Sequence, residues 1–339
     1  MSAPVRLGRP LPEVAAATPA DVVACAAEGR PTVLRGLVGD WPAVRAAREN
    51  RLADYLRSLD RGGGGDVILG GPEIEGRPFY NADLSGLNFE RARRPLAALL
   101  TALEAAADQA RPPTLYMGSV PASALTPDFS AANPAPGTPA GVEPRLWIGN
   151  ATTIQTHYDQ SDNVACAVGG QRVFTLFPPE QVANLYVGPL DFTPAGQPIS
   201  LVPFDRGDWR EDWPKFDAAA EAARHAVLEP GDAIYIPSLW WHHVQATAPL
   251  SMLVNYWWTV GRPGAPSPFD ALVLAIGALG DLPPERRRAW AAFFDHYVFE
   301  TDARTHAHLR PERRGVLGES TPVMLERIKR FVMNGLARR

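Results

Sequence analysis

The chain has 339 residues and a formal net charge of −4, without the basic surplus that a nucleic-acid-binding protein usually carries. Its content of 46% hydrophobic and 21% charged residues is typical of a folded globular protein, which excludes a disordered or fibrous chain. No apolar run approaches the roughly 18 residues that a membrane span requires. We therefore expect neither a nucleic acid nor a membrane as a partner.

The N-terminus and the cysteines bear on the compartment. Residues 1–6 lack the charged and then apolar layout of a secretory signal. Cys25 and Cys166 lie far apart and predict neither a disulfide framework nor a zinc site. These features predict a cytoplasmic protein.

Residues 1–110 predict a mixed α/β part that packs on the rest of the chain. Thr18 and Pro19 form a favourable helix start, and Gly29 is a favourable helix end. The other elements expected here are strands over 31–38 and 66–69 and helices over 42–59 and 94–107.

Residues 111–260 contain short apolar runs separated by Gly, Pro and Asn, a pattern that predicts a β-sandwich or barrel. The expected elements are strands over 115–117, 146–149, 173–177, 233–237 and 251–257, and a helix over 216–226.

Two less regular segments interrupt this pattern. The Pro- and Ala-rich stretch 121–140 has no periodicity and predicts a long loop. The insertion 180–228 carries Trp209 and Trp213. Because long loops in compact domains often cover sites, we expect both segments to frame the mouth of a binding site.

Residues 261–339 predict helices, expected over 269–279, 284–299 and 321–336. In the second of these, Trp290, Phe293 and Tyr297 recur at offsets of three and four, which is typical of one helix face. We expect this region either to pack on the same chain or to pair with a second copy.

A candidate metal site begins at His157-Tyr158-Asp159, where the chain enters a predicted strand. Side chains two residues apart on a strand share a face, so His157 and Asp159 can point at one spot. Two histidines and one carboxylate on one side of a metal are the ligands of non-haem Fe(II) oxygenases. A second imidazole would complete that set.

The stretch Pro230-Gly231-Asp232, an apolar strand and then His242-His243 offers that imidazole. Adjacent strand residues face opposite sides, so only one of the two histidines can join, and spacing alone does not choose between them. A packed strand end is the alternative interpretation, but the joint pattern favours a metal. The remaining histidines are expected to lie in helical or loop contexts without partners: His225, His296, His306 and His308.

Four motifs carry a family resemblance: HYDxxxN, GxxxFTLFPPEQ, PGDxxYIPxxWWHH and VNYWW. They resemble those of the cupin-like JmjC oxygenases, and most of all the factor-inhibiting-HIF type of asparaginyl hydroxylase and its bacterial relatives, over about residues 115–258. The resemblance implies a mainly β fold with flanking helices, in which 111–260 form a double-stranded β-helix, or jelly roll, followed by a C-terminal helical segment. It also implies Fe(II), 2-oxoglutarate as cosubstrate, O2, and hydroxylation of a C–H bond.

Carried over by motif, the resemblance makes His157, Asp159 and His242 the metal ligands of the catalytic centre, with His243 as a structural neighbour. The residues that it implies for the cosubstrate pocket are Tyr116, Asn163, Arg172, Asn255 and Trp257. Of these, Tyr116 and Arg172 would hold the far carboxylate of 2-oxoglutarate.

Two positions depart from the family pattern. Arg172 stands where a lysine is expected, but a guanidinium can hold a carboxylate through two parallel N–H bonds. Ile154 stands where a threonine is expected, and Thr153 or Thr156 is a candidate to replace the missing hydroxyl.

The predicted function is a 2-oxoglutarate-dependent dioxygenase that hydroxylates an unknown protein, peptide or small-molecule substrate. One alternative is a metal-binding cupin with a binding or regulatory role, which Ile154 and Arg172 would signal. Another is a cupin isomerase or other O2-independent metalloenzyme, in which the anchoring pocket would lack a purpose. The C-terminal helices resemble those that pair two subunits in the family, which implies a homodimer.

Overall fold

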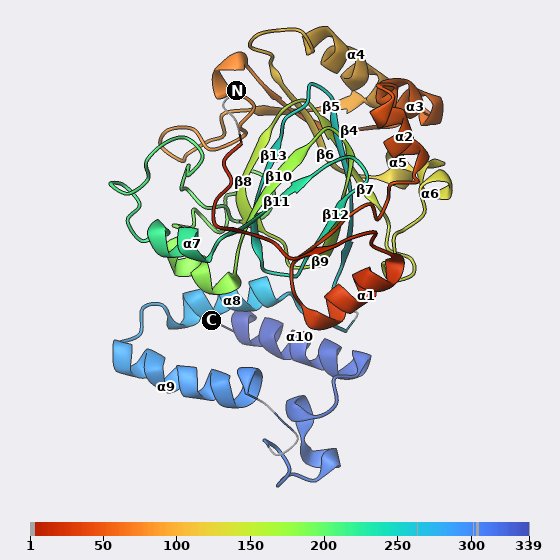
Figure 1. Cartoon of the computed structure of the whole chain (residues 1–339). Helices are drawn as coiled ribbons and strands as arrows, with labels where there is room; N and C mark the ends of the chain where they lie inside the picture. Colours follow the sequence, from red (N-terminus) through yellow and green to blue (C-terminus); the bar gives the residue numbers. More distant parts are fainter. Residues whose placement is uncertain (1–3, 263, 301, 303–304, 339) are drawn as a thin grey trace. The chain divides into compact units, whose positions relative to one another are not determined.

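A computed structural model describes residues 4–262, 264–300, 302 and 305–338 (Figure 1). The chain forms two compact units, Met1–Val260 and Gly261–Arg339. All strands of the described residues lie in the first unit, and the second is helical. No described helix is both long enough and apolar enough to cross a bilayer.

Two β-sheets make up the centre of the first unit. The smaller sheet has the strand order β1 (Arg9–Pro10), β11 (Arg224–Leu228), β10 (Arg172–Phe177), β13 (Trp241–Ala246) and β8 (Thr153–Tyr158). The larger sheet has the order β2 (Glu13–Val14), β3 (Thr32–Leu34), β12 (Ala233–Ile236), β9 (Asp162–Gly169), β14 (Ser251–Trp258), β7 (Arg145–Gly149), β6 (Thr114–Pro121), β4 (Gly64–Gly70) and β5 (Glu90–Pro95). Residues 1–110 thus contribute strands to both sheets: β1 lies in the smaller sheet, and β2, β3, β4 and β5 lie in the larger one.

The sheets pack face to face around an interior hydrophobic cluster. Phe174 and Leu176 enter it from the small sheet, and Ala165, Ile234 and Leu253 enter it from the large one. Phe174 and Leu176 are two residues apart, as the alternation of strand side chains requires. The jelly-roll core that the sequence predicts is therefore confirmed, and its strands β10, β12 and β14 match the expected apolar runs.

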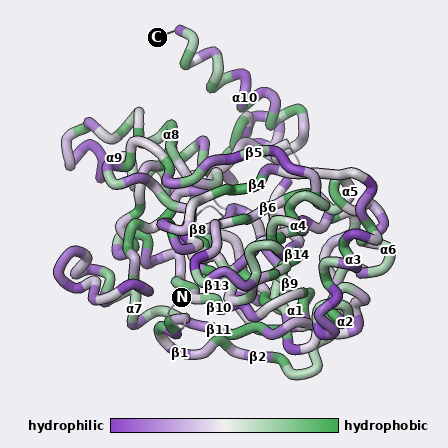
Figure 2. The backbone as a smooth tube through the Cα atoms, turned by 90° about the horizontal axis from the view of Figure 1, so that it is seen from above, coloured by the Kyte–Doolittle hydropathy of each residue, from purple (hydrophilic) through white to green (hydrophobic). Residues whose placement is uncertain are grey.

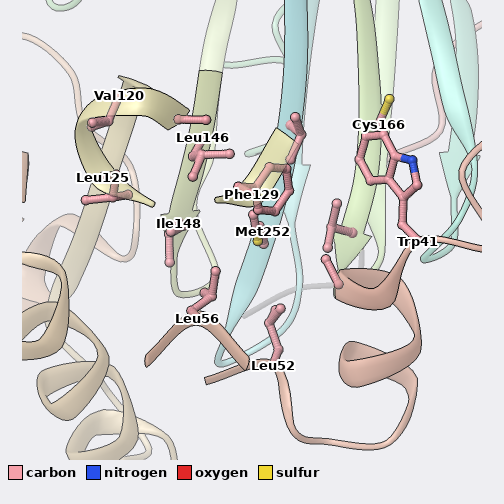
Figure 3. Packing of buried hydrophobic residues seen from close by; sticks show 14 of the residues in the cluster. Trp41, Leu52, Leu56, Val120, Leu125, Phe129, Leu146, Ile148, Cys166 and Met252 are labelled. Carbon is pink, nitrogen blue, oxygen red and sulfur yellow. The ribbon is translucent and has the colours of Figure 1, made fainter. Parts of the chain in front are cut away.

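Helices cover the outer face of the large sheet. The helices of this unit are α1 (Pro19–Glu28), α2 (Pro42–Arg48), α3 (Leu52–Leu59), α4 (Leu96–Ala106), α5 (Ala122–Leu125), α6 (Phe129–Ala132) and α7 (Phe216–Ala222), with 3-10 turns at Pro72–Ile74 and Pro179–Asn184. Figure 2 shows α1, α2, α3, α5 and α6 gathered along one side of the strands. In Figure 3, Leu56 of this helical layer lies near Ile148 and Met252 of the sheet, and Trp41 lies beside Cys166.

The N-terminal helices confirm one prediction and correct two. Helix α1 ends where expected, because Gly29 adopts a left-handed φ of 60°. The single helix expected over 42–59 is broken by Asn50, whose φ of 56° cannot continue a helix. The helix expected from Arg94 begins at Leu96, since Arg94 precedes a proline, which disfavours the helical region, and pairs in β5.

The segment 121–140 is not the structureless loop expected from its composition. It contains α5 and α6, whose Leu125 and Phe129 are fully buried. The Phe129 ring packs edge-on against Trp41, with centroids 6.2 Å apart. The helix expected over 216–226 is also shorter, because the chain turns into strand β11 at Arg224.

The second unit contains the three helices that the sequence predicts: α8 (Pro268–Leu279), α9 (Pro284–Phe294) and α10 (Pro322–Ala337). The end of the helix expected over 284–299 is wound as a π-helical segment, Asp295–Phe299. Two short 3-10 turns, Pro311–Arg313 and Gly315–Leu317, precede α10. The hydroxyl of Thr321 caps α10 by accepting a hydrogen bond from the backbone N–H of Met324 at 3.2 Å.

Candidate metal centre and adjoining pocket

A β-bulge in β8 sets the geometry of the site. His157 pairs with His242 of β13, and Ile154 pairs with Val244, so that three steps along β8 correspond to two steps along β13. The extra residue lets Ile154 and His157 face the same side, although their odd spacing would otherwise send them to opposite faces. Both therefore face the interior between the sheets.

Three of the predicted residues come together there. His157, Asp159 and His242 each offer a ligand atom, and these atoms all lie within 4.8 Å of one another. Asp159 follows directly after β8, and its Oδ2 lies 3.5 Å from Nε2 of His242. Tyr158, between the two ligands in sequence, points away and packs against Trp241 with ring centroids 4.8 Å apart.

Hydrogen bonds hold both candidate ligand imidazoles in the tautomer that can bind a metal through Nε2. Nδ1 of His157 lies 2.8 Å from the carbonyl oxygen of Gln155, and Nδ1 of His242 lies 3.0 Å from that of Trp240. Because a carbonyl can only accept, each Nδ1 carries the proton and each Nε2 keeps its lone pair. Burial, reinforced by the neighbouring His157, lowers the pKa of His242 to about 4 against the opposing effect of Asp159. His242 is therefore neutral at pH 7.

An arginine without a carboxylate partner lines the same pocket. Arg172 is 2% exposed, and its Nε and Nη2 have no hydrogen-bond partner among the described residues. Burial lowers its pKa, while the adjacent Tyr116 hydroxyl opposes that shift. Burial likewise raises the pKa of Tyr116 to about 12, against the effect of Arg172. A buried cation with free donors is costly unless an anion completes it.

The predicted amide and indole side chains also line this pocket. Asn255 donates to the side-chain oxygen of Asn163 at 3.2 Å. The Trp257 Nε1–H donates to Asp159 Oδ2 at 3.2 Å, which fixes the carboxylate beside His242. All eight predicted site residues thus lie around one pocket, although their roles stay predictions.

The pocket also contains one hydrogen-bonding residue that was not predicted from the sequence, Trp147. The indole of Trp147 donates to the side-chain oxygen of Asn255 at 2.6 Å and stands edge-on to Trp257, with centroids 5.7 Å apart. The available signal was the strand alternation, because Leu146 and Ile148 face the helical layer and leave Trp147 facing inward.

The structure rejects the expected replacement for the missing threonine. Ile154 itself lines the pocket, whereas Thr153 and Thr156 do not. The reason is the bulge, which brings Ile154 inward in phase with His157.

Only one of the two segments expected to frame the mouth of the site lies beside the candidate ligands among the described residues: Ile199 of the insertion 180–228 forms an isolated β-bridge with His157. No residue of 121–140 lines the pocket, because its apolar side chains are buried in the helical layer. Trp209 packs on Phe216 and Trp213 packs on Tyr186, with centroids 5.2 and 4.9 Å apart, in a separate cluster. The composition of these segments could not reveal which apolar side chains the core would take up.

The second histidine of the pair faces away from the metal ligands. His243 is 1% exposed, packs on Phe204 at a centroid distance of 4.6 Å, and places Nε2 3.8 Å from Oδ2 of Asp205. Burial lowers its pKa to about 3, with Asp205 opposing. His225, expected to lie in a helix or loop without a partner, instead lies in β11, with Nδ1 3.3 Å from the carbonyl oxygen of Leu7.

Facing sheets with a His–Asp–His donor set in their interior define a cupin-type fold with a candidate metal centre. Residues 20–261 match the family described as Cupin-like domain. The chain belongs to this family.

Three of the curated relatives each match about a third of the chain, and the names of two of them refer to Jumonji proteins. Jumonji C domain-containing protein 5 of Drosophila melanogaster is 34% identical over 122 residues, which are 36% of this chain and 29% of that protein. The lysine-specific demethylase JMJ31 of Arabidopsis thaliana is 30% identical over 114 residues, 33% of this chain and 20% of that protein. HSPB1-associated protein 1 of Homo sapiens is 32% identical over 122 residues, 34% of this chain and 24% of that protein. The matched stretches thus span less than a third of each relative.

Proposed function

We propose that the protein is an Fe(II)- and 2-oxoglutarate-dependent dioxygenase. It hydroxylates a C–H bond of a protein or peptide side chain or of a small molecule, and releases succinate and CO2. The observation that carries this proposal is one pocket that holds both a His–Asp–His donor set and a buried arginine with two free donors.

The donor set fits Fe(II). His157, Asp159 and His242 supply two imidazole nitrogens and one carboxylate from neighbouring strand ends. Two imidazoles and one carboxylate are the protein ligands of non-haem Fe(II) oxygenases, so these three residues would hold the iron and leave room for cosubstrate and O2.

The buried arginine fits the far carboxylate of 2-oxoglutarate. The free Nε and Nη2 of Arg172 form one edge of the guanidinium fork, and such an edge can donate two parallel hydrogen bonds to a carboxylate. The Tyr116 hydroxyl, kept protonated by its raised pKa, is a further donor beside it. An incoming dianion would thus compensate a cation that the protein leaves unpaired.

The bound iron and cosubstrate supply the oxidation, in which one oxygen atom of O2 enters the product and the other enters succinate. The chain supplies position and exclusion of water. Trp257 holds the Asp159 carboxylate, and Asn255 holds Asn163. Phe174 and other apolar side chains form the remaining wall and keep the pocket dry.

The test uses the purified full chain with Fe(II), ascorbate and 2-oxoglutarate. We expect binding of 2-oxoglutarate that requires the metal, and succinate release that increases in the presence of a substrate. Mass spectrometry of a host lysate after incubation should reveal a product heavier by one oxygen atom. A protein that neither binds 2-oxoglutarate nor forms succinate with any candidate substrate contradicts the proposal.

We also propose that the helices of the second unit pair two copies of the chain. Large apolar side chains are exposed on each of them, including Ile276 on α8, Phe293 on α9 and Phe331 on α10. Exposed apolar patches of this kind mark interaction sites. Light scattering should give the mass of a dimer, and Phe331→Glu should shift it toward a monomer; a monomeric wild type contradicts this proposal.

A further inference from the structure

A buried polar cluster lies behind the candidate metal centre, on the opposite face of the small sheet. His243 and Gln245 reach it from β13, and Arg77 and Asp205 reach it from segments outside the sheet. Arg77 and Asp205 form an ion pair whose side chains are 11% and 3% exposed. An ion pair buried this deeply adds little stability over apolar side chains of similar volume, so stability alone does not account for it.

Gln155 joins this cluster to the first candidate metal ligand. Its side-chain oxygen accepts a hydrogen bond from Arg77 Nη1 at 3.1 Å. Its Nε2 donates to the carbonyl oxygens of Ser200 and Val202, both at 2.9 Å. Its own carbonyl oxygen is the acceptor for Nδ1 of His157. The side chain of Gln155 is thus held at three points, and its backbone orients an imidazole.

The same residue lies in the bulge of β8. Gln155 and Thr156 are the two residues between the pairs Ile154–Val244 and His157–His242. Without the bulge, the strand period would turn His157 away from His242. The insertion between β10 and β11 adds a second restraint, because the N–H of Ser200 donates to the carbonyl oxygen of Thr156 at 2.8 Å.

We propose that Arg77, Asp205 and Gln155 are positioning residues that fix the bulge of β8 and thereby hold His157 at the metal centre. This inference rests on the proposed function only in requiring that the centre binds a divalent metal. Residues that support a metal ligand in this way typically change metal affinity by about 10- to 100-fold when they are replaced.

The test replaces the ion pair by apolar side chains of similar size, in the double variant Arg77→Met with Asp205→Leu. The probe is Co(II), titrated into the metal-free full chain by calorimetry and followed by its visible absorption spectrum, which reports ligand geometry. We expect Co(II) to bind about 10-fold or more weakly and with an altered spectrum, while the melting temperature stays the same or rises. Gln155→Met leaves the ion pair in place and should weaken Co(II) binding in the same way. This variant provides the test if the double variant does not fold.

Arg35→Met is the matched control. Arg35 pairs with Glu13 and Asp232 in the same unit but contacts none of the three candidate ligands, so Co(II) affinity should not change. The inference is overturned, and the proposed metal centre is not, if the wild type binds Co(II) while Gln155→Met and the folded double variant keep the same Co(II) affinity and spectrum. A wild-type chain that binds no Co(II) overturns the proposed metal centre as well.

Discussion

Two buried arginines lie on opposite faces of the small sheet, and their surroundings differ. Arg77 on the outer face meets the carboxylate of Asp205 and the amide of Gln155. Arg172 on the inner face meets the hydroxyl of Tyr116 and leaves two donors unpaired. Burial lowers the pKa of both guanidinium groups, and only at Arg77 does a carboxylate oppose that shift. A buried guanidinium without a carboxylate partner is costly. We therefore interpret Arg172, but not Arg77, as a binding site for an anionic ligand.

The metal ligands on the inner face should show the largest effect. Asp159→Ala removes the single carboxylate of the donor set, and we expect loss of stoichiometric iron and of all 2-oxoglutarate turnover. Metal analysis after anaerobic loading measures this. Asp217→Ala, an exposed aspartate outside the donor set, is the control. Retention of stoichiometric iron by Asp159→Ala would show that the donor set is assigned wrongly.

The second prediction tests the open arginine. Arg172→Met removes the cation that would meet the far carboxylate, so the dissociation constant of 2-oxoglutarate should rise about 30-fold or more. Because the unpaired buried charge is also removed, the free energy of unfolding without ligand should not fall. Arg172→Lys keeps the charge and should retain part of the affinity. If Arg172→Met and the wild type bind 2-oxoglutarate with equal affinity, Arg172 does not bind the far carboxylate and the prediction is wrong.

The paired arginine should behave in the opposite way. Asp205→Ala leaves Arg77 buried without its carboxylate, and we expect the free energy of unfolding to fall by about 3–5 kcal/mol. Urea unfolding of the metal-free protein measures it. An effect no larger than that of breaking the exposed pair Arg61–Asp128 would contradict this prediction.

The two adjacent histidines predict a pH dependence of stability. Burial holds the pKa of His242 at about 4 and that of His243 at about 3, below the usual value for an unfolded chain. Between these pKa values and that of an unfolded histidine, the unfolded state binds more protons than the folded state. The free energy of unfolding is therefore at its full value above about pH 6.5 and declines as the pH falls toward the pKa values of the folded protein. Each histidine contributes up to about 1.4 kcal/mol per pH unit in that window. Urea unfolding of the metal-free protein at several pH values should show a shallower decline for His243→Phe.

The smallest expected effect concerns the inner wall. Ile154→Thr would place a hydroxyl in the pocket, and one additional hydrogen bond is worth about 0.5–1.5 kcal/mol. We expect the affinity for 2-oxoglutarate to rise by no more than about tenfold. Calorimetry measures it, with Thr153→Val as the control because Thr153 does not line the pocket.

The sequence by itself determined much of the site, because its signals are local. Strand alternation and turn residues located β10, β12 and β14, and the His-x-Asp and Trp-Trp-His-His motifs located the three candidate ligands. The choice of His242 over His243 needed the family resemblance, since either histidine satisfies the spacing. The structure then brings His242 to the other two ligands and turns His243 toward Asp205.

Only the tertiary structure decided how β8 pairs with β13 and what lies behind it. A bulge arises from pairing between strands far apart in the chain, so no local pattern showed that Ile154, rather than Thr153 or Thr156, would line the pocket. Arg77 and Asp205 are separated by more than a hundred residues and carry no motif. The burial of Phe129 likewise depends on the distant Trp41. Local periodicity is set by the backbone of each element, whereas these contacts exist only after the sheets and helices have packed.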